Sequence, residues 1–304
     1  MDIALTNFIT LGTDRLALAL LIAASIACVW LPPQADATPS STSTLRKTID
    51  ISLVLLIITT GLVLLLRTAA LADASLLESL EFVPKVIEKS HYGTTWLGRT
   101  GALLLMVLLW CFYLRKRQGS LVNIVFMLSV CSIAFFISGA SHAGEQGLVT
   151  WENANNALHI LGGCLWGGSV IIYLMLFKQF STLNLSYTDT AHRLTLIATI
   201  ALLTTLSTGL INAWLRLETL DALWTTEYGL TLVAKLGFVA IMMGIGALNR
   251  FILIPKLARH EITPFPSTAS AHLSFRNALS IDRIVFFIII FAAAYLATLS
   301  PGHN

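Results

Sequence analysis

The sequence predicts an all-α membrane protein in which about eight transmembrane helices form one bundle. Hydrophobic residues make up 56% of its 304 residues and charged residues only 12%, whereas a soluble domain carries about 25% charged residues. The mean hydropathy is +0.79. The charges gather in short clusters between apolar runs of about 20 residues, the length that crosses a bilayer as a helix. No change in composition divides the chain, so we expect residues 1–304 to form a single membrane domain.

Polar segments bound the apolar runs in the first half of the chain. The first run is the weakest, because Asp14 and Arg15 lie at its start. The polar segment 32–47 and the acidic segment 73–93 bound the second run, and a basic cluster at 115–117 separates the third from the fourth. Apolar residues within 73–93 recur with helical spacing, which predicts a short amphipathic helix on the membrane surface.

The second half of the chain follows the same pattern. The external loop 140–153 precedes the fifth run, and Lys178 follows it. The acidic segment 217–227 separates the sixth run from the seventh, and a linker with three prolines, 255–278, precedes the eighth. The eight predicted spans are 14–31, 49–71, 94–114, 121–139, 154–177, 192–215, 228–253 and 279–299.

The distribution of charge indicates the orientation. Twelve of the 19 lysines and arginines fall on one side of the predicted spans, and 11 of the 16 acidic residues fall on the other. Basic loops remain in the cytoplasm, so we expect both termini to face a periplasm-like space. The net charge is only +3 and no basic soluble domain accompanies it. We therefore expect the lipid bilayer, and no nucleic acid, as a partner.

Four of the seven histidines fall on the external side of the predicted bundle: His91, His142, His159 and His303. Polar groups at membrane depth are costly and usually mark an ion, cofactor or substrate site. His142 follows the fourth span and His159 lies one to two turns into the fifth, so the hairpin between them can bring both rings together. Imidazole suits copper, zinc, iron and nickel. We expect His142, His159 and His303 to bind a metal ion at the external face, with His91 completing the set.

Small residues surround His159 on the fifth span. His159, Gly163 and Trp166 follow each other at helical spacing and therefore share one face. Gly163 and Gly167 form a GxxxG pattern, which lets another helix approach closely. We expect the two glycines to serve helix packing and Trp166 to shape the metal site.

Charged residues also occur in the external halves of the spans. Arg67 follows a Leu-rich run, and Lys235 lies two turns into the seventh span. Buried cations need partners, and Glu227 is a candidate. We expect these three residues to lie around the histidines. An alternative is that the cations neutralise the propionates of a haem.

Several longer motifs resemble one family. They are SGASHAG at 138–144, ALHILGGCLWGGS at 157–169, LSTGLINAWLRL at 206–217, the segment 225–250, LATLSPGHN at 296–304 and, upstream, HYGTTWLGRTGALL at 91–104. Together they resemble the copper resistance protein D (CopD) family of bacterial inner-membrane proteins. The resemblance implies an eight-span protein in copper homeostasis, with the family's histidines at His142, His159 and His303, and a separate periplasmic partner of the CopC type. The sequence departs from the family at Ser141, where glycine is frequent, and at Asp282, where glutamate is frequent.

The sequence therefore predicts a copper-handling protein, with a copper ion bound at the periplasmic face and imported across the inner membrane. We expect a transporter and name no catalytic residue. One alternative is a membrane redox protein that uses haem b or copper, because paired transmembrane histidines can hold haem. A second alternative is a copper sensor or assembly factor that binds the metal without transporting it.

Overall fold

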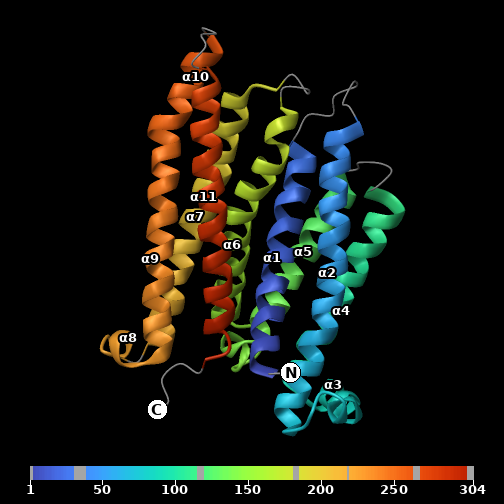
Figure 1. Cartoon of the computed structure of the whole chain (residues 1–304). Helices are drawn as coiled ribbons and strands as arrows, with labels where there is room; N and C mark the ends of the chain where they lie inside the picture. The colour runs from blue at the N-terminus through green and yellow to red at the C-terminus, as the bar shows by residue number, and fades with distance from the viewer. Residues whose placement is uncertain are drawn as a thin grey trace.

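In the part of the chain that the computed structural model describes, eight helices are long and apolar enough to cross a membrane, which confirms the predicted all-α class. The structure describes residues 3–30, 39–114, 120–180, 185–217, 219–262 and 268–299, and no strand occurs in these ranges. The long helices run side by side (Figure 1). The first described residues of α1 and the last described residues of α11 lie at the same end of the bundle, which we call the terminal end.

The spanning helices occur in the predicted order. Their bounds are α1 (Ile3–Trp30), α2 (Pro39–Ala72), α4 (His91–Leu109, continued by a π-helical turn, Trp110–Leu114), α5 (Ser120–Gly139), α6 (Trp151–Leu176), α7 (Tyr187–Arg216), α9 (Glu227–Leu248) and α11 (Thr268–Leu296). The shorter helical elements are η1 (Glu78–Phe82), α3 (Val83–Lys89), η3 (His142–Gly144), η4 (Phe177–Gln179), α8 (Ala222–Thr225) and α10 (Ile254–Ile262).

Three predicted boundaries were wrong, and each has a physical reason. Helix α1 begins at Ile3 instead of residue 14, because Asp14 is paired inside the bundle and does not mark a helix end. The linker expected over 255–278 is largely helical: a π-helical turn (Asn249–Leu253) continues α9 into α10, whose Ile254 and Leu257 are buried. The amphipathic helix expected in 73–93 is divided into η1 and α3, and a proline lies in the first turn of α3.

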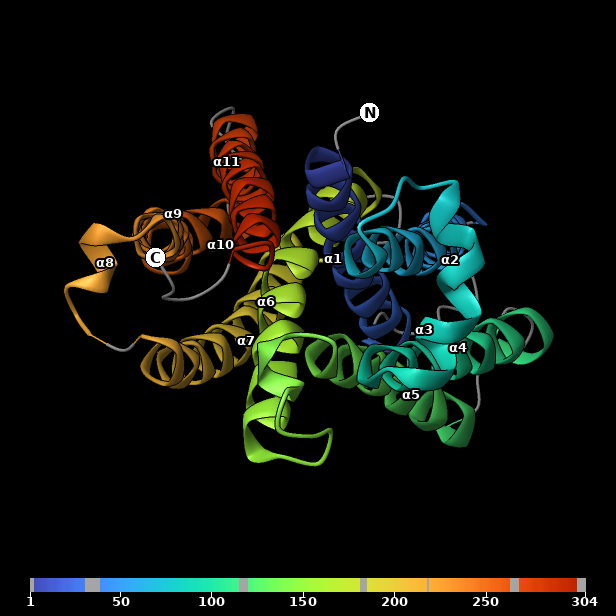
Figure 2. The same cartoon turned by 90° about the horizontal axis from the view of Figure 1, so that it is seen from below.

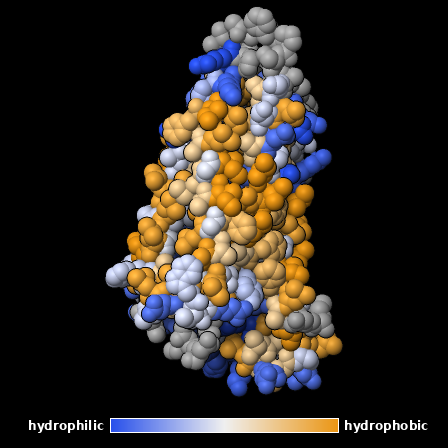
Figure 3. Space-filling model, turned by 60° about the vertical axis from the view of Figure 1, so that its left-hand side comes forward, coloured by the Kyte–Doolittle hydropathy of each residue, from blue (hydrophilic) through white to orange (hydrophobic). Residues whose placement is uncertain are grey.

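Helix α6 is the centre of the bundle. Seen from the terminal end, it is surrounded by α1, α5, α7 and α11 (Figure 2), and it packs against all four. Helix α9 packs against α11 and forms one side of the molecule. A broad apolar belt covers the face shown in Figure 3, with hydrophilic residues toward both ends, which is the surface pattern of a protein that crosses a bilayer.

Glycines on α6 allow three of these helices to approach closely. A Cβ atom at Gly162 would lie 2.7 Å from Thr205 Oγ1 of α7, and one at Gly168 would overlap the Ala19 carbonyl group of α1. A Cβ atom at Gly167 would overlap the Phe286 ring of α11. Gly163, by contrast, is at ordinary contact distance, 3.9 Å from the Thr205 methyl group. The close approaches therefore occur on three sides of α6, toward three different partners.

Candidate metal site at the terminal end of the bundle

The loop that carries His142 is held tightly against the end of α5. A Cβ atom at Gly144 would overlap the backbone of Gly139, so only glycine allows this approach. The Ser141 hydroxyl group caps the short helix η3. On this turn His142 Nδ1 lies 2.5 Å from Glu145 Oε1. The His142 side chain keeps 47% of its surface exposed, so the loop presents an accessible imidazole at the terminal end.

His159 lies in the third turn of α6 and faces α7. Its Nδ1 atom is 3.0 Å from the Thr205 carbonyl oxygen and 3.3 Å from Thr208 Oγ1. Gly209, one residue further along α7, leaves space for the ring, because a Cβ atom there would lie 2.9 Å from His159 Cε1. The ring is partly buried. Helix α7 therefore fixes the orientation of the imidazole through its backbone.

His91 is the first residue of α4 and is exposed. Its Nε2 atom lies 3.0 Å from the carbonyl oxygen of Gly139, the residue that ends α5 three positions before His142. The two histidines are therefore attached to the same short stretch of backbone, although no contact joins their rings.

All three described histidines of the predicted site share one hydrogen-bonding arrangement. Each places one ring nitrogen against an oxygen that can only accept: the Gly139 carbonyl for His91, the Glu145 carboxylate for His142 and the Thr205 carbonyl for His159. That nitrogen must therefore carry the hydrogen, and a neutral ring then keeps its lone pair on the other nitrogen. Histidines that bind metals are oriented in this way, by donating their second ring nitrogen to a carboxylate or a backbone carbonyl.

A buried network of asparagine and serine side chains connects the ends of α5, α6 and α7. Asn155 donates to Asn212 Oδ1 (2.9 Å), and Asn212 donates to Asn156 Oδ1 (3.1 Å). Asn156 in turn donates to Ser138 Oγ (2.9 Å) and lies 3.4 Å from Ser141 Oγ. The sequence analysis did not include this network. The signal for it was visible, since three asparagines within four residues (153–156) open an otherwise apolar helix.

The asparagine network connects the surroundings of the histidines. At one end Asn155 also donates to the Thr208 carbonyl oxygen (3.0 Å), and the Thr208 hydroxyl group lies beside His159. At the other end Ser141 is the residue before His142. A satisfied polar network of this kind is rigid and specifies one arrangement, so His159 and the His142 loop are positioned relative to each other.

The four residues expected around the histidines lie in different surroundings. Lys235 lies in α9, and Arg216 ends α7, the helix against which the His159 ring packs. Glu227 accepts a hydrogen bond from the Tyr295 hydroxyl group (2.5 Å), which joins the ends of α9 and α11. Trp166 is buried in the apolar core two turns below His159. Arg67 lies in α2, with its guanidinium group 5.8 Å from the centre of the Tyr92 ring.

His303 lies outside the described residues. Within the described ranges no three His, Cys, Asp or Glu side chains converge closely enough to hold a metal ion. His91, His142 and His159 are thus brought to one end of the bundle and oriented there, but they do not form a closed coordination sphere among themselves.

Comparisons with known proteins agree over most of the chain. Residues 189–296 match the family described as copper resistance protein D, and residues 13–151 match the N-terminal domain of copper resistance protein D-like proteins. Copper resistance protein D of Pseudomonas syringae pv. tomato is 24% identical over 253 residues, 78% of each chain. Copper transport protein CutJ of Bacillus subtilis (strain 168) is 24% identical over 212 residues, 67% of this chain and 38% of that protein. No solved structure matches the chain.

Proposed function

Because the chain belongs to the copper resistance protein D family and is a copper-handling, multi-pass membrane protein, we propose that it imports copper through a histidine site at its terminal end. In this proposal the membrane is the bacterial inner membrane and the terminal end faces the periplasm. The names of the two relatives, one for copper resistance and one for copper transport, support copper as the cargo.

One observation carries the proposal: the shared orientation of His91, His142 and His159. Each donates one ring nitrogen to a carbonyl or carboxylate oxygen and keeps the other nitrogen for a ligand. Imidazole is a good ligand for copper. The fourth imidazole of the proposed site is that of His303, close to the end of the chain.

The proposed roles follow from position and exposure. His142 is exposed and receives the ion first, and His91, attached to the same end of α5, assists it. His159 lies deeper, on the central helix, and takes the ion toward the membrane interior. The asparagine network holds His142, the outer ligand, and His159, the inner ligand, in a fixed position relative to each other. A separate periplasmic copper-binding protein of the CopC type would deliver the ion, and the acidic loops at this end would favour a basic docking surface on it.

The direct test is copper binding to the detergent-purified protein. We expect about one copper ion per chain, and we expect His159→Ala to weaken the binding at least tenfold, since a ligand and its orienting hydrogen bond are lost together. His192→Ala is the matched control. His192 is an exposed histidine near the start of α7, whereas His159 contacts α7 near the other end of that helix, at Thr205 and Thr208. Equal affinities of wild type and His159→Ala would contradict the proposed site.

Transport requires a second measurement. Vesicles with the periplasmic face outward should accumulate copper with the wild-type protein and lose most of that uptake with His159→Ala. Binding without uptake would favour a sensor or assembly factor. An optical spectrum of the same preparation distinguishes the redox alternative, because a Soret band lost in His159→Ala would identify a haem ligand.

A further inference from the structure

A second polar region lies among α1, α2, α4 and α5, next to the segments that carry His91 and His142. It is a cavity of about 150 Å³, and its polar lining consists mainly of Arg15, Arg67 and Arg99 with Asn7, Tyr92 and Ser141. None of the three described histidines of the proposed copper site, His91, His142 and His159, lines it. The cavity therefore has a chemistry of its own, dominated by guanidinium groups.

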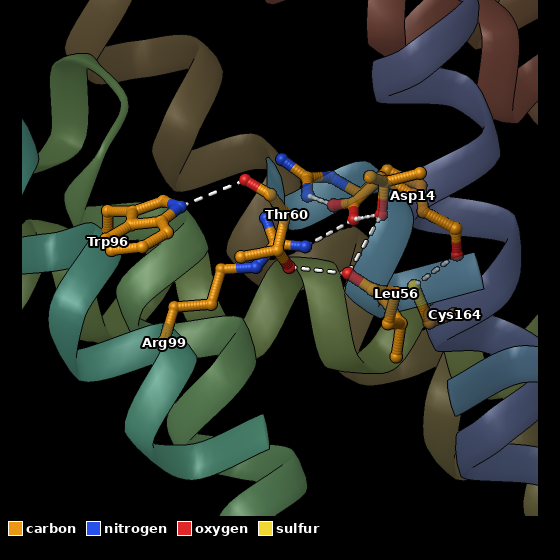
Figure 4. A network of polar contacts seen from close by, with 8 residues as sticks. Asp14, Leu56, Thr60, Trp96, Arg99 and Cys164 are labelled. Atoms are coloured by element: carbon orange, nitrogen blue, oxygen red, sulfur yellow. Dashed lines mark hydrogen bonds and ion pairs between the residues drawn. The ribbon is translucent and has the colours of Figure 1, made fainter. Parts of the chain in front are cut away.

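A single carboxylate lies behind these cations. Asp14 is fully buried, forms ion pairs with Arg99 and with Arg15 (3.0 Å), and accepts a hydrogen bond from the Thr59 hydroxyl group (2.6 Å). Figure 4 shows the Arg99 side chain extending from α4 toward Asp14 on α1. Among the described residues, no aspartate or glutamate lines the cavity itself. Three positive charges are thus opposed by one negative charge, and an excess of two remains.

The guanidinium groups also retain unused donors. Arg99 is 7% exposed, and its Nε atom is buried without a hydrogen-bond partner. Arg67 is exposed, makes no ion pair within the described ranges, and places its guanidinium group 5.8 Å from the centre of the Tyr92 ring, so its donors are available to a guest without a burial cost of their own. A buried donor without a partner costs about 1–3 kcal/mol, so a group that accepts hydrogen bonds in the cavity would remove that cost.

We propose that this cavity binds the oxygen atoms of a phosphate group. Guanidinium forks match phosphate oxygens in geometry and charge, and an anion would offset the excess positive charge, most strongly beside the buried Arg99. The volume limits the guest, since pockets for drug-sized ligands measure about 300–1,000 Å³. The phosphate group belongs either to a free inorganic anion or to the headgroup of an anionic lipid, because Arg67 lies near the end of α2 at the membrane boundary.

The test is thermal unfolding of the full-length protein in an uncharged detergent. Sodium phosphate is compared with sodium chloride at the same ionic strength, which separates binding from screening. Phosphatidylglycerol is compared with phosphatidylcholine in the same way. The variant is Arg67→Gln, which removes one cavity guanidinium without breaking an ion pair. Lys85→Gln, at an exposed position of α3, is the matched control.

We expect one of the two phosphate sources to raise the unfolding temperature of the wild type and of Lys85→Gln by about 2–4 °C. We expect Arg67→Gln to weaken that response at least fivefold. A response to inorganic phosphate identifies a free anion, and a response to phosphatidylglycerol alone identifies a lipid headgroup. Equal responses in Arg67→Gln and wild type, or no response to either source, would overturn the proposal. Direct binding of radiolabelled phosphate or lipid to the same proteins provides a second readout that does not depend on stability.

Discussion

Replacing Asp14 with Asn tests the polar core of the first half of the bundle. The substitution keeps the size of the side chain and an acceptor for Thr59, but it removes the carboxylate charge that forms ion pairs with both Arg15 and Arg99. The Arg15 side chain is 19% exposed and can turn toward water, whereas the Arg99 side chain is only 9% exposed. The cost therefore arises mainly at Arg99, as a buried cation without a counter-charge.

Removing one partner of a buried ion pair costs about 3–5 kcal/mol, and we expect Asp14→Asn to lower the free energy of unfolding by that amount. The assay is reversible unfolding in mixed detergent micelles, followed by helical circular dichroism. Asp14→Asn combined with Arg99→Gln should recover most of the loss, because the buried cation is then gone and the remaining charge, that of Arg15, can turn toward water. Glu88→Gln, at an exposed acid of α3, should have no measurable effect.

Two results would refute this reasoning. A loss below about 1 kcal/mol for Asp14→Asn would mean that water reaches Arg99 and replaces the carboxylate. A double variant as unstable as the sum of the two single variants would mean that Asp14 and Arg99 do not interact energetically.

Two further predictions concern glycines. Gly168→Ala should destabilise the bundle by about 1–3 kcal/mol, because the new methyl group would overlap the backbone of α1. Gly237→Ala on α9 is the control, since nothing lies within 4 Å of its added Cβ atom. An equal loss of stability in Gly237→Ala would contradict the packing argument. Gly209→Ala should displace the His159 ring, whose Cε1 atom lies 2.9 Å from the new carbon. We expect it to weaken copper binding several-fold without changing the unfolding midpoint. Unchanged affinity would show that copper binding does not need this position of the ring.

The helices themselves could be predicted from the sequence because a membrane span needs only length and apolar composition. The boundaries of α1 and α10 could not. Asp14 has the same appearance in the sequence whether it ends a helix or lies within one, and only its pairing with Arg99, 85 residues away, makes the second outcome possible. Likewise, the prolines of 255–278 indicated a linker, while packing of Ile254 and Leu257 against neighbouring helices stabilises a helix there.

The candidate site was predictable in its residue types and not in its arrangement. Histidines at membrane depth predict a metal site by their cost, and the charge counts predict the side of the membrane on which they lie. Which ring nitrogen of His159 is available depends on the Thr205 carbonyl oxygen of another helix, and such a backbone contact leaves no pattern in the sequence. The asparagine network has the same origin, since Asn155 and Asn212 meet only after α6 and α7 have packed.

By itself, the sequence determined the class of protein, the number and order of its spans, and which residues have side chains suited to binding copper. Hydropathy and ligand chemistry are properties of individual residues, so they can be read without the fold. The tertiary structure alone decided which groups meet: the hydrogen bonds of His91 and His159 to the backbone of other helices, the close approach of α6 to α1 at Gly168, and the convergence of three arginines on one cavity. Each of these depends on distances between helices far apart in the chain, and such distances exist only once the bundle has formed.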